Sequence, residues 1–275
     1  MCIDDKGLGK EGYTILSNPK TGKIAMMAMT TKVKYLKKIL DKIPGEIRRN
    51  VKVINKDLGR NYDWLARQYF SFATRVADKF HIVKLGLESL QAIRVRYRQA
   101  ILSAERKCDE ARKKAKKEDK DLKYFPKFKN TRFANGETQN ELLARSRGLL
   151  FKFPNQWTRT QKERAEILFQ KYPEIKKAYA LILEFRRFYQ ARDGTEAQKR
   201  LDFWIQKGNL SEISEIKNFV FTIKNHRTEI LNHFETKSSN AFAEGLNSHL
   251  QRFFVSNYGI RNRDFFHFRI KLAFS

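Results

Sequence analysis

The stretch VKVINKDLGRNYDWLARQYFSFATRVAD, residues 51–78, decides how the front of the chain folds. A short apolar run comes first, then apolar residues at helical spacing, then a second strand-like run. The expected elements are a strand with Val51, Val53 and Ile54, a helix over Tyr62–Phe70 and a strand over Phe72–Ala77. Each expected strand leads into an aspartate, Asp57 or Asp78. Because reactive groups collect beyond the carboxyl ends of strands in an open α/β sheet, the stretch predicts an acidic sheet edge.

The residues before this stretch predict further strands and one helix. Tyr13–Leu16 and Lys23–Met29 are strand-like, and the turn-forming residues between them predict a hairpin. Lys32–Lys42 carries apolar side chains at helical spacing until a Pro-Gly pair stops the helix. A first strand is expected to end at Asp4. The predicted fold class is therefore α/β, with an antiparallel edge on a mixed sheet.

Long helical patterns dominate from His81 to about Phe234, where no convincing strand is found. The expected helices are Arg94–Lys120, Gln161–Tyr172, Pro173–Ala191, Glu196–Gly208, Ser211–Phe234 and Asn240–Phe254, with a last amphipathic stretch from Arg263. The aromatic stripe within Pro173–Ala191 is expected to be core. We therefore predict three parts: 1–80 as the first part of an α/β core, 81–234 as a helical insertion and 235–275 as the closing helices of the core.

The charge of the chain indicates a polyanionic partner. The 275 residues include 57 Lys and Arg against 30 Asp and Glu, a formal net charge of +27. Nucleic acid is favoured over a membrane surface, because Lys and Arg that neutralise phosphates release condensed counterions. The dense charge run in Arg94–Lys120 fits either a solvated helix face or a surface that tracks DNA.

Several classes of protein are excluded by composition. Cys2 and Cys108 cannot form a disulfide framework or a four-ligand zinc site. No signal-peptide pattern opens the chain, and no apolar run approaches the ~18 residues that span a bilayer. A cytoplasmic protein without a membrane partner is expected.

Three acidic residues could form a metal site. Asp4 and Asp57 are expected at the ends of neighbouring strands, and carboxylate ligands suit magnesium or manganese. Glu244 shares one face of its expected helix with Asn240 and Asn247, while an apolar face packs on the sheet. Cleavage of a phosphodiester needs both the attacking and the leaving oxygen stabilised, and two divalent cations about 4 Å apart do this. An ordinary amphipathic surface helix is the alternative for Glu244.

Two choices around this site stay open. Asp4 is preferred to Asp5, because successive strand residues point to opposite faces and only one of them can reach the metals. Asp78 either caps the helix that follows it or belongs to the site. His81 either lies passively in the first turn of that helix or contacts a phosphate.

Several ordered segments resemble a known family. They are Ile3-Asp4-Asp5-Lys6 with Lys10-Glu11-Gly12-Tyr13-Thr14 and Lys20-Thr21-Gly22-Lys23, Val51-Lys52-Val53-Ile54-Asn55-Lys56-Asp57 with Tyr62, Ala77-Asp78-Lys79-Phe80-His81-Ile82-Val83-Lys84, Glu184-Phe185-Arg186 with Tyr189, Ser239-Asn240-Ala241-Phe242-Ala243-Glu244-Gly245-Leu246-Asn247-Ser248 and Tyr258-Gly259-Ile260-Arg261-Asn262. In this order they resemble the bacterial DDE (Asp-Asp-Glu) transposases of the ISL-three insertion-sequence family. Each segment is weak alone, whereas the ordered set spans nearly the whole chain.

The resemblance implies an RNase H-like fold with a large all-α insertion between the second aspartate and the catalytic glutamate. It implies that Asp4, Asp57 and Glu244 are catalytic and hold two divalent cations, Mg²⁺ or Mn²⁺, with Asp78, His81, Asn240 and Asn247 as auxiliary residues. The implied activity is metal-dependent cleavage and strand transfer of an insertion sequence. Transposon ends and target DNA are the implied partners of a homo-oligomer associated with the bacterial nucleoid.

The chain also departs from the family pattern. Only three residues precede Asp4, and the family's upstream zinc-binding and helix-turn-helix region has no counterpart, so a transposase truncated at the N-terminus is expected. His249 stands where relatives often have a lysine. Two alternatives remain: a structure-directed nuclease of the same fold, and a catalytically inactive remnant that binds DNA non-specifically through its basic helices.

Overall fold

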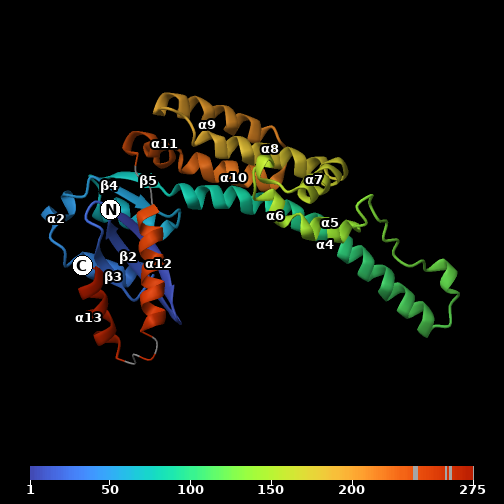
Figure 1. Cartoon of the computed structure of the whole chain (residues 1–275), viewed down its shortest axis with the longest axis horizontal. Helices are drawn as coiled ribbons and strands as arrows, with labels where there is room; N and C mark the ends of the chain where they lie inside the picture. The colour runs from blue at the N-terminus through green and yellow to red at the C-terminus, as the bar shows by residue number, and fades with distance from the viewer. Residues whose placement is uncertain (238–240, 258, 260–261, 275) are drawn as a thin grey trace. The chain divides into compact units, whose positions relative to one another are not determined.

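The structure separates the chain into two units, one built around a sheet and one built of helices (Figure 1). The computed structural model describes residues 1–237, 241–257, 259 and 262–274. The sheet unit comprises residues 1–82, 192–198 and 223–275. The helical unit comprises residues 83–191 and 199–222.

The sheet has five strands in the order β3-β2-β1-β4-β5. They are β1 (Cys2–Leu8), β2 (Glu11–Asn18), β3 (Lys23–Ala28), β4 (Val53–Lys56) and β5 (Thr74–Ala77). The strands β1, β2 and β3 pair antiparallel, whereas β1, β4 and β5 pair parallel. The predicted α/β class with an antiparallel edge is confirmed, and β2 and β3 form the expected hairpin.

The first strand is longer than expected, and the prediction that it ends at Asp4 is wrong. Parallel pairing of β1 with β4 covers only Cys2 and Ile3, but antiparallel pairing with β2 continues to Leu8. Gly9 then has φ +63°, a left-handed conformation that glycine adopts without steric cost, and the chain turns into β2. Asp4 therefore lies inside a strand, immediately after the level at which parallel pairing stops.

Helices cover both faces of the sheet. The helices of this unit are α1 (Val33–Leu40), α2 (Gly45–Arg49), α3 (Arg60–Tyr69), α11 (Arg227–Thr236), α12 (Ala241–Ser256) and α13 (Arg263–Phe274). On one face Ile3 and Ile54 are buried in a cluster with side chains of α1 and α3. On the other face Leu8 and Ile15 are buried with side chains of α12 and α13, and α12 lies in front of the strands in Figure 1. Burial of apolar surface, worth about 25 cal/mol per Å², thus stabilises both layers.

The helical unit packs around an aromatic core. Its helices are α4 (Lys79–Lys117), α5 (Gln139–Arg145), α6 (Arg147–Leu150), α7 (Arg159–Lys171), α8 (Pro173–Phe188), α9 (Gly194–Asn209) and α10 (Ser214–Asn225), of which α4, α9 and α10 extend into the sheet unit. The ring of Phe185 lies 4.6 Å from Trp204 and 5.1 Å from Phe219 between centroids. The expectation that the aromatic stripe of α8 is core is confirmed, because Tyr179 and Phe188 are also buried.

The single helix expected over Ser211–Phe234 is wrong. Two helices, α10 and α11, are separated by His226, which has φ −111° and ψ 18°. Asn225 and His226 are weak helix stop signals, and because the apolar period continues past them, the pattern was read as one helix. No helix in the part of the chain that the structure describes is long and apolar enough to cross a membrane.

Candidate active site

Three aspartates occupy one row at the carboxyl ends of the parallel strands. Residue Lys56 of β4 pairs with Ile3 of β1 on one side and with Ala77 of β5 on the other. The next residue along the chain is in each case an aspartate, and these three form what we call the aspartate row: Asp4, Asp57 and Asp78. Side chains at one level of parallel strands point to the same face of a sheet. The row therefore lies on the face opposite to Ile3, which is the face that α12 covers.

Asp4 is fastened to α12 by a hydrogen bond. Asn247 Nδ2 donates to Asp4 Oδ2 at 2.7 Å, and the Asp5 backbone N–H donates to Asp4 Oδ1 at 2.8 Å. Burial raises the pKa of the Asp4 carboxyl, and the charges of Asp78 and Asp57 add to the rise, although the Asp5 hydrogen bond and His81 oppose it. The Asp4 carboxylate is thus partly desolvated and lies near two other carboxylates, so a bound cation would stabilise its charged form.

His81 connects the other two members of the aspartate row. Its Nδ1 pairs with Asp78 Oδ2 at 2.6 Å, and its Nε2 lies 3.6 Å from Asp57 Oδ2. The hydrogen bond with Asp78 raises the pKa of His81, burial opposes the rise, and the nearby Asp57 charge adds to it. Asp78 also accepts from the Phe80 backbone N–H at 2.9 Å, so it caps α4 as one of the two expectations had it. The cap and the contact with His81 coexist, because they use different carboxylate oxygens.

Asp5 belongs to the opposite face of the sheet. Its Oδ1 accepts a hydrogen bond from Thr14 Oγ1 at 2.8 Å, and Thr14 Oγ1 lies 3.3 Å from the Tyr62 hydroxyl of α3. Burial raises the pKa of Tyr62, and its hydrogen bond with Asp5 adds to the rise. The alternation expected for successive strand residues is therefore present: Asp4 contacts α12, while Asp5 interacts on the side of α3.

A buried lysine supports the end of β4, and the sequence reasoning missed it. Lys56, directly before Asp57, is fully buried, and its Nζ lies 3.1 Å from Asp63 Oδ1 on α3. Asp63 also accepts a hydrogen bond from Arg67 Nε at 2.7 Å. Losing one member of a buried ion pair costs several kcal/mol, so this pair fixes the strand end that carries Asp57. A lysine in a short strand is normally expected to face solvent. The only sign to the contrary was that Lys56 directly precedes Asp57, so the two side chains point to opposite faces of the sheet.

The third expected carboxylate is not brought into a cluster. Glu244 is exposed in the first turn of α12, one helical turn before Asn247. Asn240, another expected auxiliary residue, lies outside the described residues. Among the residues that the structure describes, no three Asp, Glu, His or Cys side chains stand close enough together to hold one metal ion. The aspartate row therefore supplies only part of the expected set of metal ligands. The hydrogen bond from Asn247 to Asp4 brings to the row the face of α12 that also carries Glu244.

The donor chemistry of the row fits a hard divalent cation. Asp4 and Asp57 are neighbours across parallel strands, and oxygen donors of this type bind Mg²⁺ and Mn²⁺ in preference to softer metals. The Asp57 side chain is 34% exposed, so a ligand can reach it from solvent. Asp4 and Asp57 thus have both the carboxylate oxygens and the neighbouring positions that a metal site needs. Glu244 has the carboxylate oxygens but lies outside the aspartate row.

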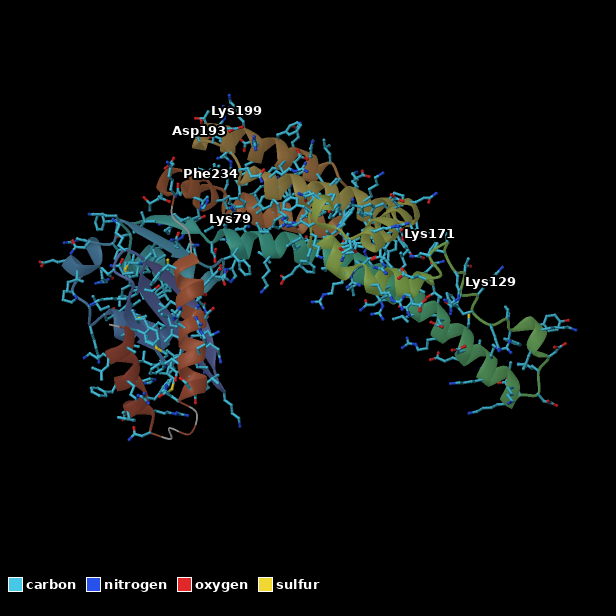
Figure 2. The ribbon with its side chains drawn as sticks, viewed as in Figure 1. Lys79, Lys129, Lys171, Asp193, Lys199 and Phe234 are labelled. Carbon is cyan, nitrogen blue, oxygen red and sulfur yellow. The ribbon has the colours of Figure 1, made fainter. Side chains whose placement is uncertain are left out.

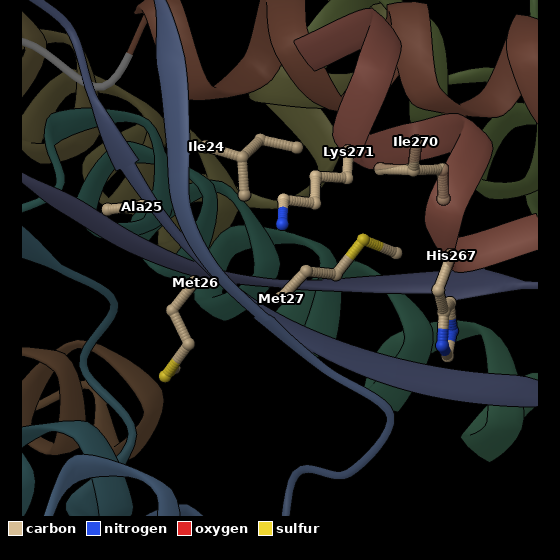
Figure 3. Close-up of a pocket in the computed structure, with 7 residues that line it drawn as sticks. All are labelled: Ile24, Ala25, Met26, Met27, His267, Ile270 and Lys271. Atoms are coloured by element: carbon tan, nitrogen blue, oxygen red, sulfur yellow. The ribbon is translucent and has the colours of Figure 1, made fainter. Parts of the chain in front are cut away.

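A separate cavity of about 290 Å³ lies against the edge strand β3 (Figure 3). It is lined by Ile24, Ala25, Met26, Met27, His267, Ile270 and Lys271, which come from β3 and α13. In Figure 3 the side chains of Ile24, Met27 and Lys271 approach one another from the two elements. No carboxylate lines this cavity, so it is not part of the aspartate row.

The chain combines a row of carboxylates with a strongly basic composition, and comparison with known proteins identifies its class as transposase. Residues 1–270 match the profile of a protein family described as a transposase. The chain belongs to this family, the ISL-three (ISL3) family of DDE transposases.

One curated relative gives the same identification. The transposase for insertion sequence element IS1001 from Bordetella parapertussis is 20% identical over 277 residues. The alignment covers all of this chain and 60% of the relative, so the chain spans about 60% of that protein's length. No solved structure matches the chain.

Proposed function

We propose that the chain is the RNase H-like catalytic part of an insertion-sequence transposase, which cleaves DNA and transfers the cut strand with the help of divalent cations. The single observation that carries the proposal is the aspartate row, because it aligns Asp4 and Asp57 on adjacent parallel strands. The formal charge of +27 supports a DNA substrate, since a basic chain gains counterion release when it neutralises phosphates. Transposon ends and target DNA are the proposed partners, and self-association is proposed because two ends must be joined.

In this proposal Asp4, Asp57 and Glu244 hold two cations, Mg²⁺ or Mn²⁺. When bound, the cations supply Lewis acidity that stabilises both the attacking and the leaving oxygen of an in-line displacement. Asn247 orients Asp4 by donating to Oδ2, and the Asp5 backbone N–H donates to Oδ1, so each oxygen keeps one lone pair for a ligand. His81, held by Asp78, faces Asp57 and can hydrogen-bond a phosphate oxygen that enters the row. Glu244 completes the set if the first turn of α12 moves towards the row.

The proposed parts follow the chain. Residues 1–80 and 235–275 supply the RNase H-like core, and residues 81–234 form an all-α insertion between Asp57 and Glu244. Support for the insertion comes from the order of the elements, because every helix or strand that the structure describes from α4 to α11 is a helix.

Replacing Asp57 by Asn tests the enzymatic proposal. Loss of one shared carboxylate removes several kcal/mol of transition-state stabilisation, so cleavage should slow by about 10³-fold or more. The assay is cleavage of a labelled duplex that carries the element's ends, in Mg²⁺, in Mn²⁺ and in EDTA. Asp264→Asn, an exposed aspartate on α13, is the matched control and should cleave like the unmodified chain. Equal rates for the two variants would refute the role given to Asp57.

A second candidate function is a catalytically inactive remnant that binds DNA through its basic helices. It is favoured by the absence of an assembled three-residue cluster among the described residues. The unmodified chain decides: no cleavage with either metal, together with salt-sensitive DNA binding, selects the remnant. If cleavage occurs, precleaved 3′ ends offered with target DNA distinguish a transposase from a nuclease, because only the transposase joins them.

A further inference from the structure

The C-terminal end of α4 and the loop after it form a strongly basic hairpin. Residues 105–132, which we call the basic tip, contain twelve Lys and Arg against six Asp and Glu, an excess of six positive charges. The basic tip lies wholly within the helical unit. Figure 2 shows Lys129 in the loop beyond α4, and many stick side chains around it end in nitrogen.

The loop of the basic tip is folded against α4 rather than merely solvated. Arg112 Nη1 donates to the backbone carbonyls of Leu122 and Phe125, and Asn130 Nδ2 donates to Glu105 Oε1 at 3.3 Å. Ala115 of α4 is only 1% exposed. These contacts give the hairpin a defined shape, so its charges are presented on a fixed frame.

An open cavity of about 540 Å³ lies between α4 and the loop. It is lined by Glu105, Asp109, Arg112, Lys113, Lys116, Leu122, Lys127 and Phe128. The two acids come one or two turns before the basic residues on α4, so the positive charge gathers towards the end of the helix. With Lys127 from the loop, the lining carries four basic and two acidic side chains, so the cavity is net cationic.

Three lysines of this cavity are available to an anionic ligand. Lys113, Lys116 and Lys127 are exposed, and within the described part of the chain none of them forms an ion pair. By contrast, Lys120 and Lys123 of the same hairpin are paired with Glu118 and Asp121. Unpaired ammonium groups on adjacent surfaces interact strongly with a chain of phosphates, because each contact releases a condensed counterion.

We infer that the basic tip binds the sugar-phosphate backbone of duplex DNA, at a site separate in sequence from the aspartate row. The inference rests on the proposed function for its choice of DNA as the polyanion. A concave cationic surface fits the projecting ridge of a duplex backbone. The apolar lining residues Leu122 and Phe128 are half-buried, which does not suit insertion into a lipid surface. The contact carries no base sequence, because phosphate contacts position a protein without reading bases.

The test is a triple variant of the full chain, Lys113→Gln, Lys116→Gln and Lys127→Gln. Arg112 is left in place because it holds the loop on α4. The control changes the same number of exposed lysines elsewhere in the helical unit: Lys162→Gln, Lys171→Gln and Lys176→Gln. Both variants lose three positive charges, so long-range electrostatics change equally.

Affinity for a random-sequence duplex is measured by fluorescence anisotropy across a salt series, in EDTA. Each lost phosphate contact flattens the slope of log affinity against log salt by about 0.9, so the tip variant should lose about 2–3 from the slope and the control less than 1. Equal changes in the two variants would overturn the inference. So would a tip variant that binds duplex normally but loses binding to vesicles containing phosphatidylserine, or to single-stranded RNA alone. Circular dichroism confirms that both variants are folded.

The outcome is separable from that of the proposed enzyme. Binding in EDTA does not depend on metal, so the salt slope reports on phosphate contacts and not on cleavage. If the unmodified chain cleaves DNA but the tip variant keeps its slope, the basic tip is wrong and the enzyme stands. If cleavage is absent but the tip variant loses slope, the basic tip stands and the enzymatic proposal fails.

Discussion

Changing Glu137 to Gln in the helical unit tests how a buried carboxylate contributes to stability. Glu137 is 4% exposed and accepts hydrogen bonds from Arg164 Nη2 at 2.7 Å and Nε at 3.0 Å, and from Arg145 Nη1 at 3.2 Å. Removing one partner of a buried ion pair costs about 3–5 kcal/mol. Gln keeps one acceptor oxygen, and Arg145 is 56% exposed and regains water, so we expect a loss of about 2–3 kcal/mol at pH 7.

The same variant should show a specific dependence on pH. The hydrogen bond from Arg164 lowers the pKa of Glu137, burial opposes this, and Arg145 adds to the lowering. A carboxylate with a depressed pKa in the folded state stabilises above the pKa of about 4.3 for unfolded glutamate. That contribution disappears as the pH falls through the lower folded value. The stability gap between the unmodified chain and Glu137→Gln is therefore largest at pH 7 and shrinks by pH 3.

Urea unfolding followed by tryptophan emission measures the gap. In a Trp64→Phe background the emission comes from Trp157 and Trp204, both in the helical unit. A gap below about 0.5 kcal/mol at pH 7 would refute the reasoning, because a surface carboxylate costs no more than that. A large gap of equal size at pH 7 and pH 3 would also refute it, since the loss would then come from packing rather than charge.

Two further changes probe the packing of each unit. Asn247→Leu removes the donor to Asp4 and should lower the free energy of unfolding, measured in urea, by about 1–2 kcal/mol. Glu244→Gln, which changes an exposed side chain on the same helix, should have no effect, and equal stabilities of the two variants would contradict the role of the contact. Gly208→Ala would place a Cβ 2.4 Å from Val220 Cγ2 and should destabilise by about 1–3 kcal/mol in urea unfolding. Gly148→Ala, whose Cβ meets nothing within 4 Å, should be neutral or stabilising, and matching losses at both glycines would be inconsistent with crowding at Gly208.

Local patterns in the sequence predicted most of the elements. Apolar spacing found α7, α8 and the strand that ends before Asp57, because the period of a helix or strand is set within a few residues. The break at His226 was missed, because the stop signals of Asn225 and His226 are weak and the apolar period continues past them. The continuation of β1 past Asp4 also escaped, because its hydrogen-bond partners are supplied by β2 and not by β1 itself.

The candidate site was predicted in part for the same reason. Asp57 and Asp78 were found as residues that follow strands, and Asn247 was placed on the face of Glu244 by helical spacing alone. The contact of Asn247 with Asp4 joins residues 243 positions apart, and no local pattern encodes it. The ion pair of Lys56 with Asp63 was hidden because residue type favours exposure for lysine, and only the burial of its strand reverses that preference.

The three parallel strands end in register, so the chain should tolerate a deleted residue in some segments and not in others. Deleting one residue from the four of β4 would exchange the faces served by Lys56 and Asp57, so a carboxylate would meet α3 and an ammonium group would meet α12. A deletion in the loop after α4 shifts no paired strand. Scanning single-residue deletions should therefore find residues 53–57 intolerant even where each substitution is accepted, and residues 118–133 permissive.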